Sequence, residues 1–446
     1  MLQPTLMANR VTEVHHRTDN NLKKALIIAL LSRIVIGVLI QHWYSSFTFN
    51  TNGILSINEI YAKEPFISEY TTKYTGLFVR WDSEWYIYIA EHGYPTSIPV
   101  SGNWAFSPLY PLLSDGLSKA VLSSRPISLL PFLSATNQMQ SSIILSGIVI
   151  TNLAFFASVY YLYKLTLKLF KSSQIALVST VFYSFFFGGV YLSAFYPEAL
   201  FMALAFSSFY YLEEEQFLIA GALGALASLA RSDGFLIFTV FVVYALQKLN
   251  FKKANIKLLV KPIAASIAII SSFLVFNIIG LILVPSVPFP IQVVARNTHW
   301  VYPPLITQLD SSYFNGYTIS LLCLKSPSLF IDNNYSLSYP TFISMGLLFI
   351  IVLPIAYFLI RIKRVFTIES KTLPYWSFYG LTALVLFTQS WALSAFRYSI
   401  PLIPMYWVSA KIYGKNKIAG LLLFAAMSIM LLLCICLFAI GDGLFS

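Results

Sequence analysis

Long apolar runs separated by short polar segments dominate the chain. Many windows of 18 residues or more carry few charges, which is long enough for a helix to cross a bilayer. The apolar positions are continuous rather than alternating, so they favour helices over the strands of a membrane barrel. We therefore expect an all-α polytopic membrane protein with about eleven transmembrane helices. The expected spans are 22–40, 142–163, 174–192, 197–212, 217–230, 235–248, 262–284, 340–360, 374–393, 399–413 and 418–440.

Two long segments interrupt this pattern, residues 43–140 and 285–339. Because the other connections are short, we treat 1–446 as a single integral-membrane domain, with a polar tail at 1–21. The tail does not have the pattern of a cleaved signal peptide. We call the two long segments the first and second loops.

Residues 105–123 of the first loop are apolar, but they contain Pro108, Pro111 and Asp115. As a complete span this segment would reverse the orientation of everything after it. We interpret it as interfacial or re-entrant, because non-helical backbone at membrane depth needs shelter by protein.

Composition agrees with a membrane protein and charge indicates its orientation. Hydrophobic residues make up 57% of the chain and charged residues 11%, against about 25% charged in soluble domains. Basic residues gather in the short loops, so they predict a cytosolic N-terminus with both long loops on the lumenal side. The net charge of +11 therefore reflects topology, and no nucleic acid is expected. The basic loops contain Lys164, Lys168 and Lys171; Lys248, Lys252, Lys253, Lys257 and Lys261; Arg361, Lys363, Arg364 and Lys371; Lys411, Lys415 and Lys417.

Two observations complete the picture of the loops. The acidic run 213–215 lies in a loop expected to be cytosolic, but acidic residues count little in the charge rule. The glycosylation sequon Asn334-Tyr335-Ser336 falls in the second loop, which agrees with a lumenal position.

The cysteines and histidines show no metal-ligand spacing, so no metal and no cofactor is expected. Cys434 and Cys436 lie in an apolar run and are expected to be small buried hydrophobes; Cys323 stands apart.

The remaining ionisable residues form four clusters that the topology brings to one membrane face. They are Arg80, Asp82 and Glu84 in "FVRWDSEWYIYIAEHGYP"; Glu198 in "SAFYPEALF"; Arg231 and Asp233 in "ASLARSDGF"; and Arg397 in "SAFRYSIPLIP". Ionisable groups near membrane depth are costly and commonly mark a site. Structural roles remain open: the arginines can snorkel to headgroups, Glu198 suits a helix N-terminus, and Asp233 can pair with Arg231.

An interfacial helix is expected at 82–92, since Trp81, Trp85 and Tyr88 recur at helical spacing. That aromatic stripe favours packing over chemistry. Asp82 is different, because it lies at the start of the helix, at the boundary between water and lipid. A catalytic base would have to lie at this boundary to meet both a polar acceptor and a donor carried by a lipid.

These blocks carry a family resemblance. "RWDSEWYIYIAEHGYP" with "WAFSPLYPLL", then "SAFYPEALF", "ARSDGF" and "AFRYSIPLIP" resemble, in order, four blocks of the PIG-V-type GPI mannosyltransferase 2 family. The resemblance extends from about Arg80 to Trp407. One departure is Asp233, where many members of the family have Asn.

The resemblance implies a GT-C glycosyltransferase in the endoplasmic reticulum membrane with a lumenal active site. It implies transfer of the second mannose, in α1,6 linkage, from dolichyl-phosphate-mannose to the GPI-anchor precursor. It also implies contact with membrane lipids and a small membrane partner subunit. The matching blocks give the candidate site residues: Asp82 as catalytic, and Arg80, Trp81, Glu84, Glu198, Arg231, Asp233, Arg397 and Tyr398 as substrate-binding.

Inverting transfer needs a base for the acceptor hydroxyl and help for the departing phosphate. Asp82 is our candidate base. Arg397, and after it Arg231, are the candidate phosphate ligands, because a planar guanidinium matches phosphate oxygens. Glu198 is expected to orient the acceptor or to hold an arginine. Trp81, Trp85 and Trp104 are either sugar platforms or packing residues.

Two other classes of membrane protein could also carry such charges. A transporter or scramblase also uses intramembrane charges, but it places them near the midplane and often shows repeat symmetry, whereas these charges gather at one face. Another GT-C enzyme with the same lipid donor remains open, since only the motifs indicate the GPI pathway. A purely structural role would not require the charges to converge.

Overall fold

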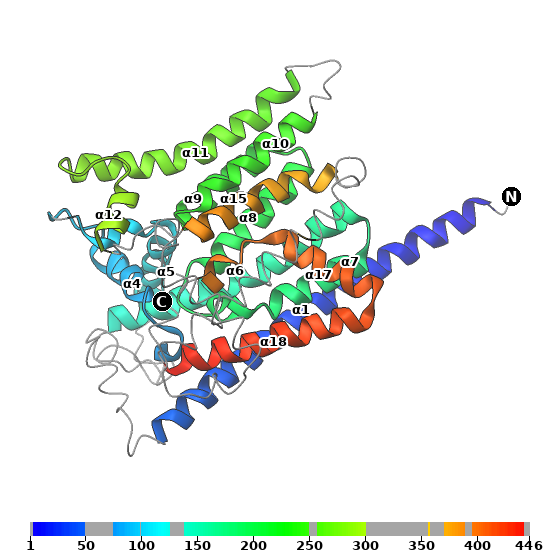
Figure 1. The fold of residues 1–446 in the computed structure, drawn as a ribbon, viewed down its shortest axis with the longest axis horizontal. Coiled ribbons are helices and arrows are strands. Elements are labelled where there is room, and N and C mark those ends of the chain that lie inside the picture. The colour runs from blue at the N-terminus through cyan, green and yellow to red at the C-terminus, as the bar shows by residue number, and fades with distance from the viewer. Residues whose placement is uncertain are drawn as a thin grey trace.

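The computed structural model describes residues 3–49, 75–98, 100–124, 138–248, 257–299, 356, 370–388 and 395–440. Within these ranges all regular structure is helical, with 3₁₀ turns between the α-helices. The all-α class is therefore confirmed. Figure 1 shows a helical bundle in which α4 (Ser83–His92), α5 (Leu109–Ser124) and α12 (Ile291–His299) lie together at one end.

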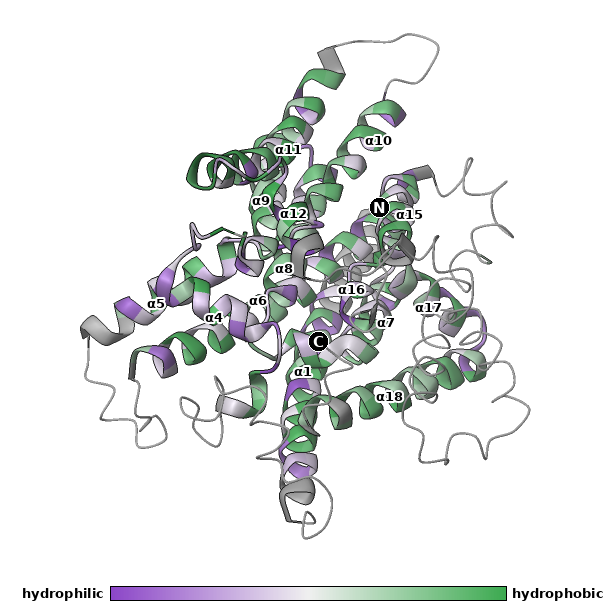
Figure 2. Cartoon of the chain, turned by 60° about the vertical axis from the view of Figure 1, so that its left-hand side comes forward, coloured by the Kyte–Doolittle hydropathy of each residue, from purple (hydrophilic) through white to green (hydrophobic). Residues whose placement is uncertain are grey.

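In the described part of the chain, four helical stretches are long and apolar enough to cross a bilayer. They are Thr18–Tyr44 in α1 (Gln3–Phe49), Met139–Phe170 in α6 (Gln138–Phe170), Leu259–Leu283 in α11 (Lys257–Leu283) and Lys417–Cys436 in α18 (Lys417–Ile440). Much of their surface is exposed and apolar, as Val38 and Ile282 illustrate. Figure 2 shows the contrast between the apolar helices α11 and α18 and the more polar α4 and α5. Extensive apolar surface of this kind is what lipid covers.

Shorter helices fill the space between these long ones. They are α7 (Ser173–Ser184), α8 (Glu198–Glu213), α9 (Phe217–Ala230), α10 (Phe238–Lys248), α15 (Leu373–Thr388), α16 (Ala395–Tyr398) and α17 (Ile403–Lys415), with 3₁₀ segments η1 (Thr75–Phe78), η2 (Gly102–Ala105), η5 (Phe187–Leu192), η6 (Gly234–Ile237) and η8 (Ser370–Thr372). Helices therefore occupy every expected span except 340–360, of which only residue 356 is described. Cys323 and the sequon lie outside the described residues. The eleven-span count remains a prediction.

The expected continuous span 174–192 is wrong, because the chain breaks between α7 and η5. A buried arginine of α1 satisfies the backbone at this break. Arg33 donates from Nη2 to the Ser184 carbonyl at 2.6 Å and from Nη1 to the Gly189 carbonyl at 2.7 Å. Its guanidinium also lies 4.0 Å from the centre of the Phe155 ring. Irregular backbone is tolerated at such depth only with partners of this kind.

The apolar segment 105–123 is mostly α5, a helix of 16 residues. At about 1.5 Å per residue it is shorter than the roughly 30 Å hydrocarbon core. Whether α5 is interfacial or re-entrant stays a prediction.

The acidic turn 213–215 joins α8 to its neighbours. Its three glutamates bind Tyr375 at 2.8 Å, Lys168 at 2.8 Å and Lys248 at 2.7 Å, in that order. The turn therefore gathers the basic ends of α6 and α10 at one end of the bundle. Glu198 begins α8, so it lies at the opposite end, about 24 Å away at 1.5 Å per residue.

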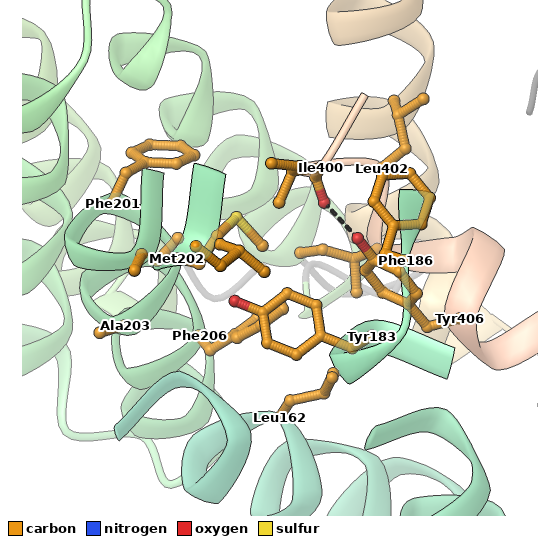
Figure 3. Packing of buried hydrophobic residues seen from close by; sticks show 14 of the residues in the cluster. Leu162, Tyr183, Phe186, Phe201, Met202, Ala203, Phe206, Ile400, Leu402 and Tyr406 are labelled. Carbon is orange, nitrogen blue, oxygen red and sulfur yellow. Dashed lines mark hydrogen bonds between the residues drawn. The ribbon is translucent and has the colours of Figure 1, made fainter. Parts of the chain in front are cut away.

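A core of aromatic and aliphatic side chains fixes the relative positions of α7, α8 and α17. Figure 3 shows Tyr183 packed between Phe206 and Tyr406, all three of them buried. The Tyr406 hydroxyl donates to the Ile400 carbonyl at 2.7 Å. This bond closes the turn between α16 and α17 and so fixes the segment that carries Arg397.

Gly188 of η5 marks the closest approach to α16. A Cβ at this position would lie 2.6 Å from the Phe396 carbonyl oxygen. We expect Gly188→Ala to destabilise the protein by about 1–3 kcal/mol, the usual effect of overpacking. The measurement is the melting temperature of the purified protein in detergent.

Gly116 provides the matched control for that experiment. It lies in α5, and a Cβ there would have no neighbour within 4 Å. Gly116→Ala should be neutral or stabilise by about 0.5–1 kcal/mol, because alanine favours a helix interior. Equal melting temperatures for Gly188→Ala and Gly116→Ala would contradict the predicted clash.

Candidate active site

Side chains from all four charged clusters meet in one buried network. Arg397 Nη1 lies 2.5 Å from Asp82 Oδ2, and its Nε lies 3.3 Å from Glu198 Oε1. Arg231 Nη1 lies 2.5 Å from the same Glu198 oxygen, and its Nε lies 2.9 Å from Asp233 Oδ1. The network thus runs Asp82–Arg397–Glu198–Arg231–Asp233. We call these five residues, with Tyr398, the ionic cluster.

Three hydrogen bonds bring the first loop to the start of α8. Phe195 N donates to the Phe78 carbonyl at 2.8 Å, and Ser83 Oγ donates to the Phe195 carbonyl at 3.0 Å. The Tyr196 hydroxyl donates to the Arg80 carbonyl at 2.6 Å. Residues 78–83 are therefore attached to the segment just before Glu198.

Trp81 turns the chain so that neighbouring side chains face different partners. Its φ of 43° is left-handed, which is unusual for a bulky residue and is found at strained sites. The Trp81 ring packs edge-on against Phe438 of α18 at 5.5 Å, whereas Asp82 faces Arg397. Asp82 is the N-cap residue of α4, but its side chain makes no capping hydrogen bond. Its carboxylate is thus available to the cluster.

Aromatic rings support the two arginines of the cluster. The Tyr398 ring centre lies 5.0 Å from the guanidinium carbon of Arg231 and 5.0 Å from that of Arg397. Tyr196 lies 5.2 Å from the Arg397 guanidinium. Cation–π contacts of this length stabilise desolvated cations. Phe396, the neighbour of Arg397, packs against the Phe187 ring at 5.2 Å and fixes α16 on η5.

The three carboxylates of the cluster differ in how much of each side chain is exposed to solvent. The Asp82 side chain is 14% exposed and that of Asp233 is 12% exposed, whereas Glu198 is 2% exposed. Burial disfavours ionisation of Asp233 in its turn, but the charge and hydrogen bonds of Arg231 outweigh it and lower the pKa of Asp233. Glu198 serves two arginines from inside the cluster, so Asp82 and Asp233 are the acids nearest to solvent.

The Arg397 contacts are ion pairs by distance. Its Nε and Nη1 atoms do not reach hydrogen-bonding geometry with the two carboxylates, and Glu198 Oε2 is also buried without a hydrogen-bond partner. Arg231, by contrast, makes hydrogen bonds to both Glu198 and Asp233. Arg397 instead donates from Nη2 to the Tyr398 hydroxyl at 3.2 Å.

Three of the predicted site residues lie outside this network. Arg80 donates instead to backbone carbonyls, among them Phe438 O at 3.2 Å and Ala439 O at 3.3 Å. Trp81 packs on α18, and Glu84 lies half-buried in the first turn of α4. Their substrate-binding roles stay predictions.

The other two candidate sugar platforms, Trp85 and Trp104, are engaged in packing. Trp104 is 1% exposed, and its indole N–H donates to the Pro95 carbonyl at 2.8 Å. Trp85 stacks on Phe106 at 5.8 Å. Both contacts favour the packing interpretation over a sugar platform.

Sequence reasoning missed two arginines. Arg33 has a signal, since it interrupts the first apolar run, but its partners are backbone atoms. Arg296 of α12 lies 5.8 Å from the centre of the Tyr398 ring. It was missed because the second loop carries no recognisable block, so nothing linked it to the cluster.

Among the described residues, no group of three or more His, Cys, Asp or Glu side chains is placed to hold a metal ion. Cys434 is buried and Cys436 is half-buried, and both are free thiols. The prediction of a small buried hydrophobe is confirmed for Cys434, whereas Cys436 is only half-buried.

The fold and site together define a helical membrane protein whose ionisable groups converge at one end of the bundle. The chain belongs to the mannosyltransferase (PIG-V) family, whose model matches residues 22–286. The matched region contains Asp82, Glu198, Arg231 and Asp233. Arg397 lies beyond it, yet it contacts residues inside it.

Curated proteins that are similar to this chain are named as GPI mannosyltransferases. The chain is 29% identical over 188 residues to GPI mannosyltransferase 2 of Schizosaccharomyces pombe, covering 41% of this chain and 35% of the relative. It is 33% identical over 156 residues to GPI alpha-1,6-mannosyltransferase 2 of Mus musculus, covering 35% of this chain and 29% of the relative. The chain thus matches about a third of the length of these relatives.

Among solved structures, the chain is similar to the oligosaccharyltransferase of Archaeoglobus fulgidus. In its complex with zinc and sulfate the TM-score is 0.46 at 13% identity, covering 94% of this chain and 53% of the other. The apo form gives a TM-score of 0.44 at 12% identity, covering 94% and 56%. A likeness this slight supports no argument about activity.

Proposed function

We propose that this protein transfers mannose from dolichyl-phosphate-mannose to a GPI-anchor precursor, forming an α1,6 linkage on the lumenal side of the endoplasmic reticulum membrane. Family membership supports the reaction class, and the names of the relatives support the acceptor and the linkage. The observation that carries the proposal is the Asp82–Arg397 pair: a partly exposed carboxylate held at 2.5 Å by an arginine from the far end of the chain.

The proposed chemistry is balanced in atoms and charge. The acceptor hydroxyl oxygen attacks the anomeric carbon of the donor, forming a glycosidic bond while the bond from carbon to phosphate oxygen breaks. Asp82 takes the hydroxyl proton and becomes neutral. The phosphate leaves as a monoester with one more negative charge. A positioned general base contributes about 10²–10⁴-fold to such a step.

The remaining cluster residues would position that base. Arg397 orients the Asp82 carboxylate. Glu198 holds both Arg397 and Arg231, because both arginines contact the same Glu198 oxygen. Because the four clusters belong to segments far apart in sequence, the bundle must assemble before the base is in place.

The test is genetic complementation followed by a membrane assay. Cells that lack their second GPI mannosyltransferase should regain surface GPI-anchored proteins when they express this chain. Microsomes from those cells should add labelled mannose from dolichyl-phosphate-mannose to the precursor that carries one mannose. Correctly inserted protein that restores neither would refute the proposed acceptor. Transfer to a different glycolipid or to protein would indicate another enzyme that uses the same lipid donor.

A further inference from the structure

Three guanidinium groups surround the ring of Tyr398, and they differ in their partners. Arg231 and Arg397 lie in ion pairs with the three carboxylates of the cluster. Arg296 lies 5.8 Å from the same ring. Within the described part of the chain, no carboxylate lies within ion-pair distance of Arg296. Arg296 is close enough to Asp233 for its charge to help lower the pKa of that carboxyl, but among the described residues it forms no ion pair.

The helix that carries Arg296 is fixed rather than loosely attached. Ile291 and Ala295 of α12 are 1% and 0% exposed, and they pack in a small core with Trp104 of η2 and Phe276 of α11. The second loop is thus packed on the first loop at this point. Arg296 is presented by a rigid element, so its position does not depend on ordering of a loop.

A polar network next to this core gives α12 its register. Gln292 N donates to Asn277 Oδ1 at 3.1 Å, and Asn277 Nδ2 donates to Gln292 Oε1 at 3.2 Å. Gln292 Nε2 also donates to Ser107 Oγ at 3.4 Å. Residues four apart share one face of a helix, so the bonds of Gln292 also set the direction of Arg296. Arg296 itself remains half-buried, with part of its side chain open to solvent.

Charge in the cluster favours an anion at Arg296. With all six groups ionised, the three carboxylates of Asp82, Glu198 and Asp233 match the three guanidinium groups of Arg231, Arg397 and Arg296 in number. When Asp82 takes a proton, the site gains one positive charge while the departing phosphate gains one negative charge. The two buried arginines are already in contact with carboxylates, so a phosphate would have to displace those contacts to reach them.

We propose that Arg296 binds the phosphate of the polyprenyl-phosphate sugar donor, while Arg397 and Arg231 position Asp82 and Glu198. This inference rests on the proposed function and deepens it. A guanidinium that is partly exposed and forms no ion pair among the described residues can make the bidentate contact that phosphate favours. The acceptor glycolipid also carries a phosphodiester, so the test must separate the two sources.

The experiment uses the purified full-length protein in detergent and lipid, as wild type, Arg296→Gln and Arg296→Lys. The first measurement is the inhibition constant of polyprenyl monophosphate, the product anion, in competition with the donor. The second is the KM of the acceptor. Loss of a charged hydrogen-bonded contact should raise the inhibition constant roughly 10- to 100-fold in Arg296→Gln. Arg296→Lys should fall between Arg296→Gln and wild type, because it keeps the charge and loses the planar fork.

Lys119→Gln is the matched control, since Lys119 is an exposed cation of α5 paired with Asp115. It should leave both constants unchanged. An unchanged inhibition constant in Arg296→Gln would overturn the inference. A rise confined to the acceptor KM would overturn it as well, since the phosphate would then belong to the acceptor.

Binding measured without turnover keeps this result separate from the proposed function. Polyprenyl monophosphate should raise the melting temperature of wild type, because a ligand of the native state stabilises it. The rise should be smaller in Arg296→Gln at equal ligand concentration. A wild-type protein without transfer activity refutes the proposed function, whereas equal thermal shifts in the two proteins refute the role of Arg296.

Discussion

Replacing Asp82 with asparagine is expected to lower mannose transfer by about 10²–10⁴-fold, the usual contribution of a general base. Asparagine keeps the shape of the side chain but does not take up the hydroxyl proton. Arg397 keeps its ion pair with Glu198 at 3.3 Å, so the cluster should stay assembled. The measurement is the initial rate of labelled mannose transfer in microsomes that contain equal amounts of the wild-type protein and the variant.

Asp115→Asn is the control for this experiment. Asp115 belongs to the same loop, and it pairs on the surface of α5 with Lys119 at 2.7 Å. Its replacement removes one carboxylate without touching the ionic cluster and should leave the rate near wild type. Normal turnover by Asp82→Asn would end the assignment of Asp82 as the base, and the melting temperature of the variant will exclude misfolding as a cause of lost activity.

Replacing Glu198 with alanine is expected to destabilise the protein by about 3–5 kcal/mol, because it breaks buried ion pairs by removing one partner. The Glu198 side chain is 2% exposed and contacts both Arg231 and Arg397. Without it, the two buried guanidinium groups that contact the Tyr398 ring lose their shared counter-charge. We expect a lower melting temperature in detergent and a smaller yield of monodisperse protein.

Two further variants identify the cause of that effect. Glu198→Gln keeps the volume and one carbonyl acceptor, so its loss of stability should be smaller than that of alanine. Glu215→Ala removes an exposed glutamate whose pair with Lys248 is at 2.7 Å, and it should change stability by less than about 1 kcal/mol. If Glu198→Ala melted like wild type and lost only activity, Glu198 would belong to the chemistry rather than to the scaffold.

The apolar pattern predicted most of the fold, because helices that lie in lipid need long runs of apolar side chains. It placed helices at the described spans, and it placed Glu198 correctly as the first residue of α8. It failed at 174–192, because a run of apolar side chains does not indicate whether the backbone stays helical. A carbonyl at the break accepts a hydrogen bond from Arg33, a residue about 150 positions earlier in the chain, and the apolar pattern does not show that contact.

The candidate site was predicted as a set of residue types at one end of the bundle, but not as a network. Topology indicates at which end of a helix a residue lies and not the direction in which it points. Asp82, Glu198, Arg231 and Arg397 therefore could be grouped, whereas the sharing of one Glu198 oxygen by two arginines could not. Arg80 is an arginine expected at the same end of the bundle as Arg231 and Arg397, yet its guanidinium binds backbone carbonyls of α18. Only the packed structure distinguishes the two roles.

The attachment of Arg80 has a consequence for truncated forms of the chain. Two of its acceptors, the carbonyls of Phe438 and Ala439, belong to the last turn of α18, and the Phe438 ring also supports Trp81. A premature stop codon at the start of this turn would remove the turn and the residues after it. The other long helices would stay whole. The truncation would nevertheless remove the carbonyls that hold Arg80 and so loosen the segment that presents Asp82. We therefore expect a truncation at the carboxyl end to lower sugar transfer.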